Sequence, residues 1–251
     1  MQVALVPFGE TGPVCYNLIL HGGCSSVVEL RTVAPAVVGS NPTTHPKRSP
    51  SIETHQMFFP FRKPSEGELE YFVSGLSQSH YSYPDVGATA KSIPPSYSID
   101  HNRIRLGNGT ECWTRAVDAI RSWEMFNIGW TQVCWPDVPI RAGTDVAVLI
   151  RHYGFYSLNG ARVVYLIDED DLVKRFGFAY GTLQQHAESG EERFLVEWDQ
   201  QDDSVWYDLL AFSRPAHLMT RLGFPLARAL QRRFAADSKA RMAAIVKGSV
   251  S

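Results

Sequence analysis

The chain has 251 residues, a formal net charge of −2 and an isoelectric point near 6.4, and 44% of its residues are hydrophobic. This length and apolar content predict a globular protein with a sizeable core. The near-neutral charge excludes a strong overall attraction to nucleic acid, and no apolar run reaches the roughly 20 residues of a membrane-spanning helix.

The cysteines and the first residues bear on the compartment of the protein. Cys15, Cys24, Cys112 and Cys134 form no CxxC pair and show no Cys/His spacing of a metal site. The opening residues lack the basic flank that is typical of a signal peptide. We therefore expect reduced thiols, a cytoplasmic protein, and neither a metal nor another cofactor.

The first 56 residues have an unusual character. Codons permitted by Ser25-Ser26-Val27-Val28-Glu29 resemble the D-arm of a transfer RNA gene, and codons permitted by Gly39-Ser40-Asn41-Pro42 resemble its T-arm at a suitable separation. We interpret residues 1–56 as a disordered, non-native extension translated from such a region, with the native start near Met57. An ordinary disordered or targeting extension is the alternative.

The predicted domain, residues 57–251, begins with a short helix after Pro64. Ser65 is expected to cap this helix, with Glu68 completing a capping box. Residues 77–98 are rich in Tyr and Pro, which favours extended and turning backbone. A strand is then expected over residues 99–106, followed by a helix over residues 110–125.

Six further apolar and β-branched runs predict strands, with an expected turn at Asn159-Gly160 and a loop that contains His186, Glu191 and Glu192. From residue 218 to residue 247, leucines recur every four positions and predict a long closing helix. The six strands are expected at residues 128–135, 145–152, 162–168, 174–183, 193–199 and 204–213.

This order of elements predicts an α+β helix-grip fold, in which a curved antiparallel sheet of about seven strands wraps a long C-terminal helix. Such folds often leave a cavity between sheet and helix, and an α+β sandwich without a cavity is the alternative. Aromatic residues such as Phe178 and Tyr180 lie on expected strands and would line that space. Gly177 and Gly181 predict bends or a close approach of another chain segment.

Three blocks of the sequence carry a family resemblance. They read YPDVGAT at residues 83–89, FAYGTL at residues 178–183 with His186 and Gly190-Glu191-Glu192 after it, and FSRP at residues 212–215. The chain from about residue 57 to residue 247 thereby resembles uncharacterised protein family 0548. The resemblance implies a START-like helix-grip domain, a superfamily whose members commonly hold apolar or amphipathic small molecules. Gln184-Gln185 departs from the Pro-Gly of the family pattern and leaves that turn's geometry open.

The expected function is therefore binding of a small apolar or amphipathic molecule between sheet and helix. Arg214 ends the last strand, where its planar guanidinium could bind a carboxylate or phosphate of the ligand. An ion pair of Arg214 with Asp208 or Glu197, or a contact with helix-end carbonyls, is the alternative. The predicted ligand-binding residues are Tyr180, His186, Glu191, Arg214 and Gln231.

An enzyme is the first alternative function. His186, Glu191 and Glu192 supply an imidazole and two carboxylates, which are groups suited to acid–base chemistry. A solvated turn with a hydrogen-bonded glutamate explains the same residues, so no catalytic residue is assigned. Their spacing matches no zinc motif, and no metal ligand is assigned either.

An interaction module is the second alternative, because basic residues gather in the closing helix. A solvated helix face, with cations favoured toward the C-terminal end, explains the same charges without a specific nucleic-acid partner. The basic residues are Arg221, Arg228, Arg232, Arg233, Lys239, Arg241 and Lys247, against Asp237 alone.

Overall fold

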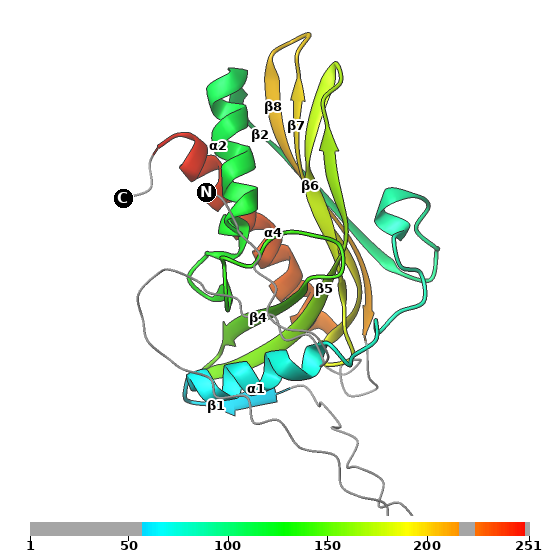
Figure 1. Ribbon diagram of the computed structural model, residues 1–251, viewed down its shortest axis with the longest axis vertical. Helices are drawn as coiled ribbons and strands as arrows, with labels where there is room; N and C mark the ends of the chain where they lie inside the picture. The colour runs from blue at the N-terminus through cyan, green and yellow to red at the C-terminus, as the bar shows by residue number, and fades with distance from the viewer. Residues whose placement is uncertain (1–56, 216–223, 249–251) are drawn as a thin grey trace, which may run out of the picture. The chain divides into compact units, whose positions relative to one another are not determined.

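The computed structural model describes residues 57–215 and 224–248, so the extension predicted over residues 1–56 lies outside the described residues (Figure 1). The sheet strands are β1 (Met57–Pro60), β2 (Ser98–Asn108), β3 (Thr131–Val133), β4 (Asp145–His152), β5 (Phe155–Glu169), β6 (Val173–Thr182), β7 (Glu188–Asp199) and β8 (Ser204–Pro215). The helices are α1 (Glu66–Leu76), α2 (Gly109–Arg121) and α4 (Phe224–Val246), with short 3-10 turns η1 (Ala88–Ala90) and η2 (Glu124–Phe126). Within these described ranges, no helix combines the length and the apolar character that crossing a membrane requires.

The strands form one eight-stranded antiparallel sheet with the order β2-β8-β7-β6-β5-β4-β3, and β1 pairs with β5. The sheet curls around α4, with α2 beside that helix (Figure 1). We call the sheet surface against α2 and α4 the helix face, and the opposite surface the outer face. The α+β helix-grip fold predicted from the order of elements is confirmed.

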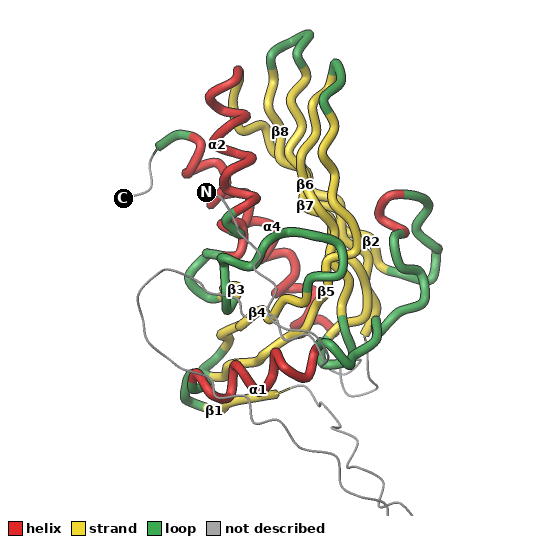
Figure 2. The backbone as a smooth tube through the Cα atoms, in the orientation of Figure 1, coloured by secondary structure: helices red, strands yellow, loops and turns green. Residues whose placement is uncertain are grey.

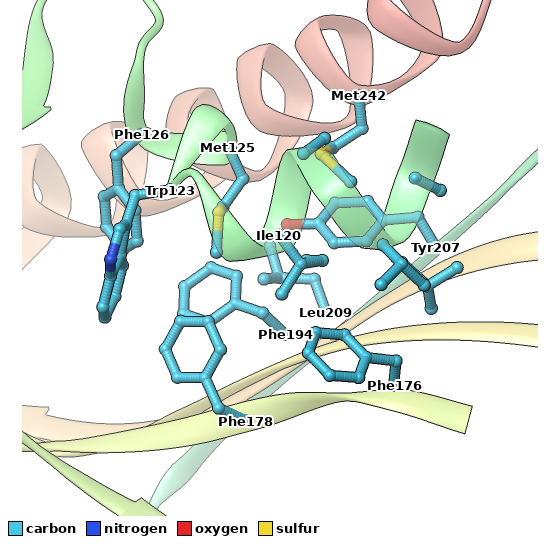
Figure 3. Close-up of a cluster of buried hydrophobic side chains, with 14 of the residues drawn as sticks. Ile120, Trp123, Met125, Phe126, Phe176, Phe178, Phe194, Tyr207, Leu209 and Met242 are labelled. Carbon is cyan, nitrogen blue, oxygen red and sulfur yellow. The ribbon is translucent and has the colours of Figure 1, made fainter. Parts of the chain in front are cut away.

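The core lies between the helix face and the two helices. Trp123 packs edge-on against Phe178, with ring centroids 4.8 Å apart, and Phe126 contacts Phe194 at 5.2 Å (Figure 3). Phe126 also reaches Phe234 of α4 at 5.4 Å. Each such side chain contributes roughly 1.5–3 kcal/mol when fully buried, so this aromatic cluster holds α4 against the sheet.

The outer face is covered by α1 and by residues 77–97, a largely irregular segment that Figure 2 shows between α1 and β2. Phe72 and Leu76 of α1 pack with Leu158 of β5. Farther along the sheet, Tyr83 and Phe212 pack edge-on at 5.6 Å. Side chains on both sheet surfaces are therefore buried, and successive strand residues belong to different layers.

The start of α1 follows the sequence prediction. The backbone N–H of Glu68 donates to Ser65 Oγ at 3.4 Å, while the N–H of Ser65 donates to Glu68 Oε2 at 2.8 Å, which completes the capping box. Arg62 adds two hydrogen bonds of 2.7 Å to the same carboxylate. Local sequence chemistry therefore fixes where this helix begins.

The expected turn at Asn159-Gly160 is wrong, because both residues lie inside β5 and pair with Val148 and Ala147 of β4. A Cβ at Gly160 would lie 2.6 Å from Leu76 Cδ2 of α1. The glycine thus permits a close approach of the helix rather than a reversal of the chain.

The expected loop around Glu191 and Glu192 is also wrong. Both residues lie in β7, where Glu191 pairs with Gly181 and Glu192 with Tyr180. The close approach predicted for Gly177 and Gly181 is present, since an added Cβ would lie 2.1 Å from Phe194 O and 2.1 Å from Tyr83 Oη, respectively.

Candidate functional site

A cavity of about 240 Å³ lies between the helix face and α4. Its apolar wall comes from η2 and the residues after it, from β4 and β8, and from α4. The main apolar side chains are Phe126, Trp130, Val148, Ile150, Leu209, Leu230 and Phe234. This composition, with a few polar groups along one side, is that of a pocket for a small molecule.

Tyr180 and Glu192 form the first polar pair of the cavity. They lie opposite each other on β6 and β7, and Tyr180 Oη donates to Glu192 Oε2 at 3.0 Å. Burial raises the pKa of Glu192 to about 8, and the nearby acids Glu188 and Asp100 act in the same direction. The carboxyl group of Glu192 is therefore largely protonated at neutral pH.

Gln231 of α4 is the centre of a second polar group. Its Nε2 donates to Ser213 Oγ at 2.8 Å and also to Glu188 Oε2, while its Oε1 accepts from Arg228 Nη1 at 2.8 Å. Arg228 in turn binds both carboxylate oxygens of Asp100 on β2. These contacts tie α4 to three strands beside the cavity.

His186 lies in the turn between β6 and β7 and lines the cavity. The turn that the sequence left open is closed by a hydrogen bond from His186 N to Leu183 O at 3.0 Å. The ring Nδ1 accepts from Glu188 N at 3.0 Å, and burial lowers the pKa of His186 to about 4. Among the described residues, no hydrogen bond joins His186 to Glu191 or Glu192, so the geometry lacks the direct contact of an acid–base pair.

Glu191 borders the cavity, but its carboxylate is engaged by the segment that covers the outer face. Tyr83 Oη and Gly87 N each donate to Glu191 Oε2 at 2.6 Å. Thr89 N donates to Glu191 Oε1 at 3.0 Å, and Thr89 Oγ1 donates to the same oxygen. Glu191 is only 2% exposed, so this carboxylate anchors the YPDVGAT block to the sheet.

Arg214 also borders the cavity, and its guanidinium lies over the ring of Tyr97 at 5.1 Å. Among the described residues, Arg214 forms no ion pair with Asp208 or Glu197, whose carboxylates bind Arg193 and Arg175, each at 2.9 Å. The structure thus brings Tyr180, His186 and Gln231 together around the cavity, while the side chains of Glu191 and Arg214 make contacts with residues 83–97.

The basic residues of α4 are largely engaged within the domain. Arg228 binds Asp100, and Lys239 Nζ donates to Asn102 Oδ1 at 3.0 Å. Arg241 binds Glu124 of η2 at 2.5 Å. Arg221 lies outside the described residues. Three basic residues of the closing helix therefore fasten α4 to β2 and η2.

Sequence reasoning missed two acids of the cavity, Asp100 and Glu188. Asp100 lies on β2, where residues alternate strictly between half-buried and exposed positions from Ser98 to Arg105. The strand expected over residues 99–106 was the usable signal, because alternate residues of a strand share a face, which places Asp100 with Asn102. Glu188 carried no comparable signal, since its partner Gln231 is 43 residues away in the chain.

Comparisons with known proteins identify the family of this chain. The model of the domain of unknown function DUF1990 matches residues 82–241. A UPF0548 protein of Dictyostelium discoideum is 35% identical over 199 residues, covering 72% of this chain and 92% of the relative. A UPF0548 protein of Deinococcus radiodurans is 39% identical over 189 residues, covering 70% and 92%. A solved structure of a hypothetical protein from Helicobacter pylori matches with a TM-score of 0.42 and 14% identity, over 68% of this chain and 96% of that one. The family resemblance of the three blocks is confirmed, and the chain belongs to the DUF1990 family of UPF0548 proteins.

Proposed function

We propose that the protein binds a small apolar or amphipathic molecule in the cavity between the helix face and α4. The observation that carries this proposal is the cavity itself, about 240 Å³ with a largely apolar and aromatic wall. Burial of ligand surface at roughly 25 cal/mol per Å² supplies the affinity. The polar groups along one side supply orientation.

The polar contacts of this proposal come from the strand and helix residues that reach the cavity. Tyr180 and Gln231 offer a hydroxyl and an amide, and His186 offers a neutral imidazole. Glu191 and Arg214 act indirectly, by holding the segment that covers the outer face. Their side-chain contacts with residues 83–97 support this role.

An acid–base enzyme receives less support from the geometry. That function would use His186 with Glu191 or Glu192. Both carboxylate oxygens of Glu191, however, already accept hydrogen bonds from residues 83–89. The pKa of about 4 also leaves His186 uncharged and weakly basic at neutral pH. The binding function requires none of these proton transfers.

In this proposal, the domain of residues 57–251 binds the molecule, and the protein acts in the cytoplasm. Cys112 and Cys134 are free thiols, as a reducing compartment favours. Mass spectrometry of the mature N-terminus from source cells tests the boundary. A peptide from residues 24–43 would contradict the interpretation of residues 1–56 as non-native.

The test of binding uses the full chain and the uncharged dye N-phenyl-naphthylamine, whose fluorescence rises in apolar surroundings. Ala235 of α4 lines the cavity and is 6% exposed, whereas its neighbour Ala236 is exposed. Ala235→Phe should therefore fill the cavity and weaken dye binding about tenfold or more, while Ala236→Phe leaves it unchanged.

A second cavity variant, a folding check and mass spectrometry complete this test. Ala211→Phe, placed on β8 at the cavity wall, should weaken dye binding as Ala235→Phe does. Thermal denaturation checks that each variant remains folded. Native and denaturing mass spectra of protein from source-like cells should also reveal a small molecule released on unfolding. Equal dye binding by wild type and both filled variants would refute the proposal.

A further inference from the structure

We propose that the molecule bound in this cavity carries a basic group, such as an amine, which sits between the carboxyl groups of Glu188 and Glu192. This inference rests on the proposed binding function and names its ligand class. The apolar part of the ligand then lies against Phe126, Trp130 and Phe234.

The cavity contains more acidic than basic groups. Asp100, Glu188 and Glu192 all line it, and among residues 57–215 and 228–248 Asp100 alone of the three forms an ion pair, with Arg228. Within residues 57–215 and 228–248, no lysine or arginine forms an ion pair with Glu188 or Glu192. Both groups instead accept hydrogen bonds from neutral donors, Gln231 and Tyr180.

The histidines of the cavity do not offset this excess. His152 and His186 both line the cavity, and burial lowers the pKa of each. Both rings are therefore neutral at neutral pH. The side-chain guanidinium of Arg214 lies over Tyr97 of the outer-face segment. Arg228 acts electrostatically on Glu188, but no cation of the described residues pairs with Glu192, so a cation in contact with Glu192 would come from the ligand.

Glu192 has free capacity for such a contact. Among the described residues, Tyr180 donates the one hydrogen bond to Glu192, at Oε2. The other oxygen, Oε1, accepts none from these residues and is not fully buried. An ionised carboxylate accepts several hydrogen bonds, and one from an ammonium group is roughly twice as strong as one from a neutral donor. The exposed oxygen is thus suited to an amine in the cavity.

The wall of the cavity suits the remainder of an amphipathic cation. The ring of Phe234 lies 5.4 Å from that of Phe126 and 6.5 Å from that of Trp130. Aromatic faces attract a neighbouring cation and also bury apolar ligand surface. Acid on β7 and aromatic rings on η2 and α4 therefore offer complementary contacts to the two ends of one molecule.

Binding of a cation should be linked to proton release. Glu192 has a pKa of about 8, and a bound ammonium group favours its ionised form. Affinity for an amine should therefore rise as the pH increases toward about 8, until the amine itself loses its proton. The titratable groups that act on Glu192 among the described residues are Tyr180 on β6, Glu188 on β7, Asp100 on β2 and Tyr207 on β8, and Arg228 on α4 acts on Glu188 and Asp100.

The experiment compares three probes of similar shape by calorimetry on the full chain: phenylbutylamine, phenylbutanol and phenylbutyrate. At about pH 7, the amine should bind about tenfold tighter than the alcohol, and the acid weakest. Glu192→Gln and Glu188→Gln should each reduce amine affinity about tenfold, while leaving alcohol affinity within about twofold. Glu70→Gln, an exposed acid on α1, is the matched control and should change neither.

The outcomes separate this inference from the proposed function. If the alcohol or the acid binds as tightly as the amine, or if Glu192→Gln leaves amine affinity unchanged, the cation proposal is overturned while cavity binding stands. If N-phenyl-naphthylamine binds but phenylbutylamine does not, the cation proposal is likewise overturned while cavity binding stands. If neither the dye nor any of the three probes binds, both proposals fail.

Discussion

Glu191 and Glu192 are chain neighbours on β7 with different surroundings, and replacing each by glutamine should change stability in opposite directions. The carboxylate of Glu191 accepts hydrogen bonds from Tyr83, Gly87 and Thr89, and it is 2% exposed. Glu191→Gln keeps the size of the side chain but replaces one acceptor oxygen with a donor NH₂ group. We expect a strong loss of stability.

The magnitude follows from the donors at each oxygen of Glu191. Oε1 receives Thr89 N and Thr89 Oγ1, and Oε2 receives Tyr83 Oη and Gly87 N. Whichever oxygen becomes NH₂, one backbone N–H loses its acceptor, which costs about 1–3 kcal/mol. The remaining bonds lose the benefit of a charged acceptor, so the total is about 3–5 kcal/mol. This is a large share of a typical stability of about 5–15 kcal/mol.

Urea denaturation of the full chain, followed by tryptophan fluorescence at about pH 7, measures this loss. Tyr83→Phe removes one donor and should cost about 1–2 kcal/mol, a useful intermediate. A Glu191→Gln variant within about 1 kcal/mol of wild type would refute the idea that this carboxylate anchors residues 83–89.

Three further predictions concern other parts of the domain. The pKa of Glu192 is about 8 in the folded protein against an ordinary 4.5, so this group lowers the free energy of unfolding as pH rises from about 4.5 to about 8. Glu192→Gln should remove that loss and raise the free energy of unfolding by up to about 4 kcal/mol near pH 8, measured by denaturation across pH. A variant less stable than wild type at pH 8 would contradict the burial of this acid. Gly177→Ala should lower the free energy of unfolding by about 3 kcal/mol or more, or prevent folding, because the added Cβ would meet the backbone of β7. A melting temperature equal to that of wild type would contradict this close approach. Ser65→Ala should cost about 1 kcal/mol through loss of the α1 cap, detectable as a shift in the urea midpoint, whereas no shift would mean that the cap contributes little.

The sequence predicted the fold well where local chemistry decides the structure. Ser65 and Glu68 marked the start of α1 because a capping box needs only neighbouring residues. The seven expected strands correspond to β2 through β8, since apolar, β-branched runs favour buried strands. The short strand β1, which pairs with residues 155–158 of β5, was not expected. Its pairing depends on a partner far along the chain.

The errors at the site have the same physical origin. Glu191 was assigned to a loop because adjacent acids beside glycine resemble a solvated turn. Its stabilising partner Tyr83 is 108 residues away, and no local pattern reveals that contact. Asn159-Gly160 matched a turn signal for the same reason, although packing of Leu76 explains the glycine. Tyr180 and Gln231 line the cavity because they belong to the strand expected over residues 174–183 and to the expected closing helix; that they bind a ligand stays a prediction.

The arrangement of β7 has a consequence for how this domain can vary. Since side chains of a strand alternate between faces, inserting one residue before Glu191 would move Glu191 onto the helix face and Glu192 one position farther along the outer face. A carboxylate that anchors residues 83–89 would enter the cavity, and the covering segment would lose its acceptor. Insertions in the turn that holds His186 therefore disturb both the packing of the covering segment and the lining of the cavity. Substitutions at either glutamate would separate the two properties.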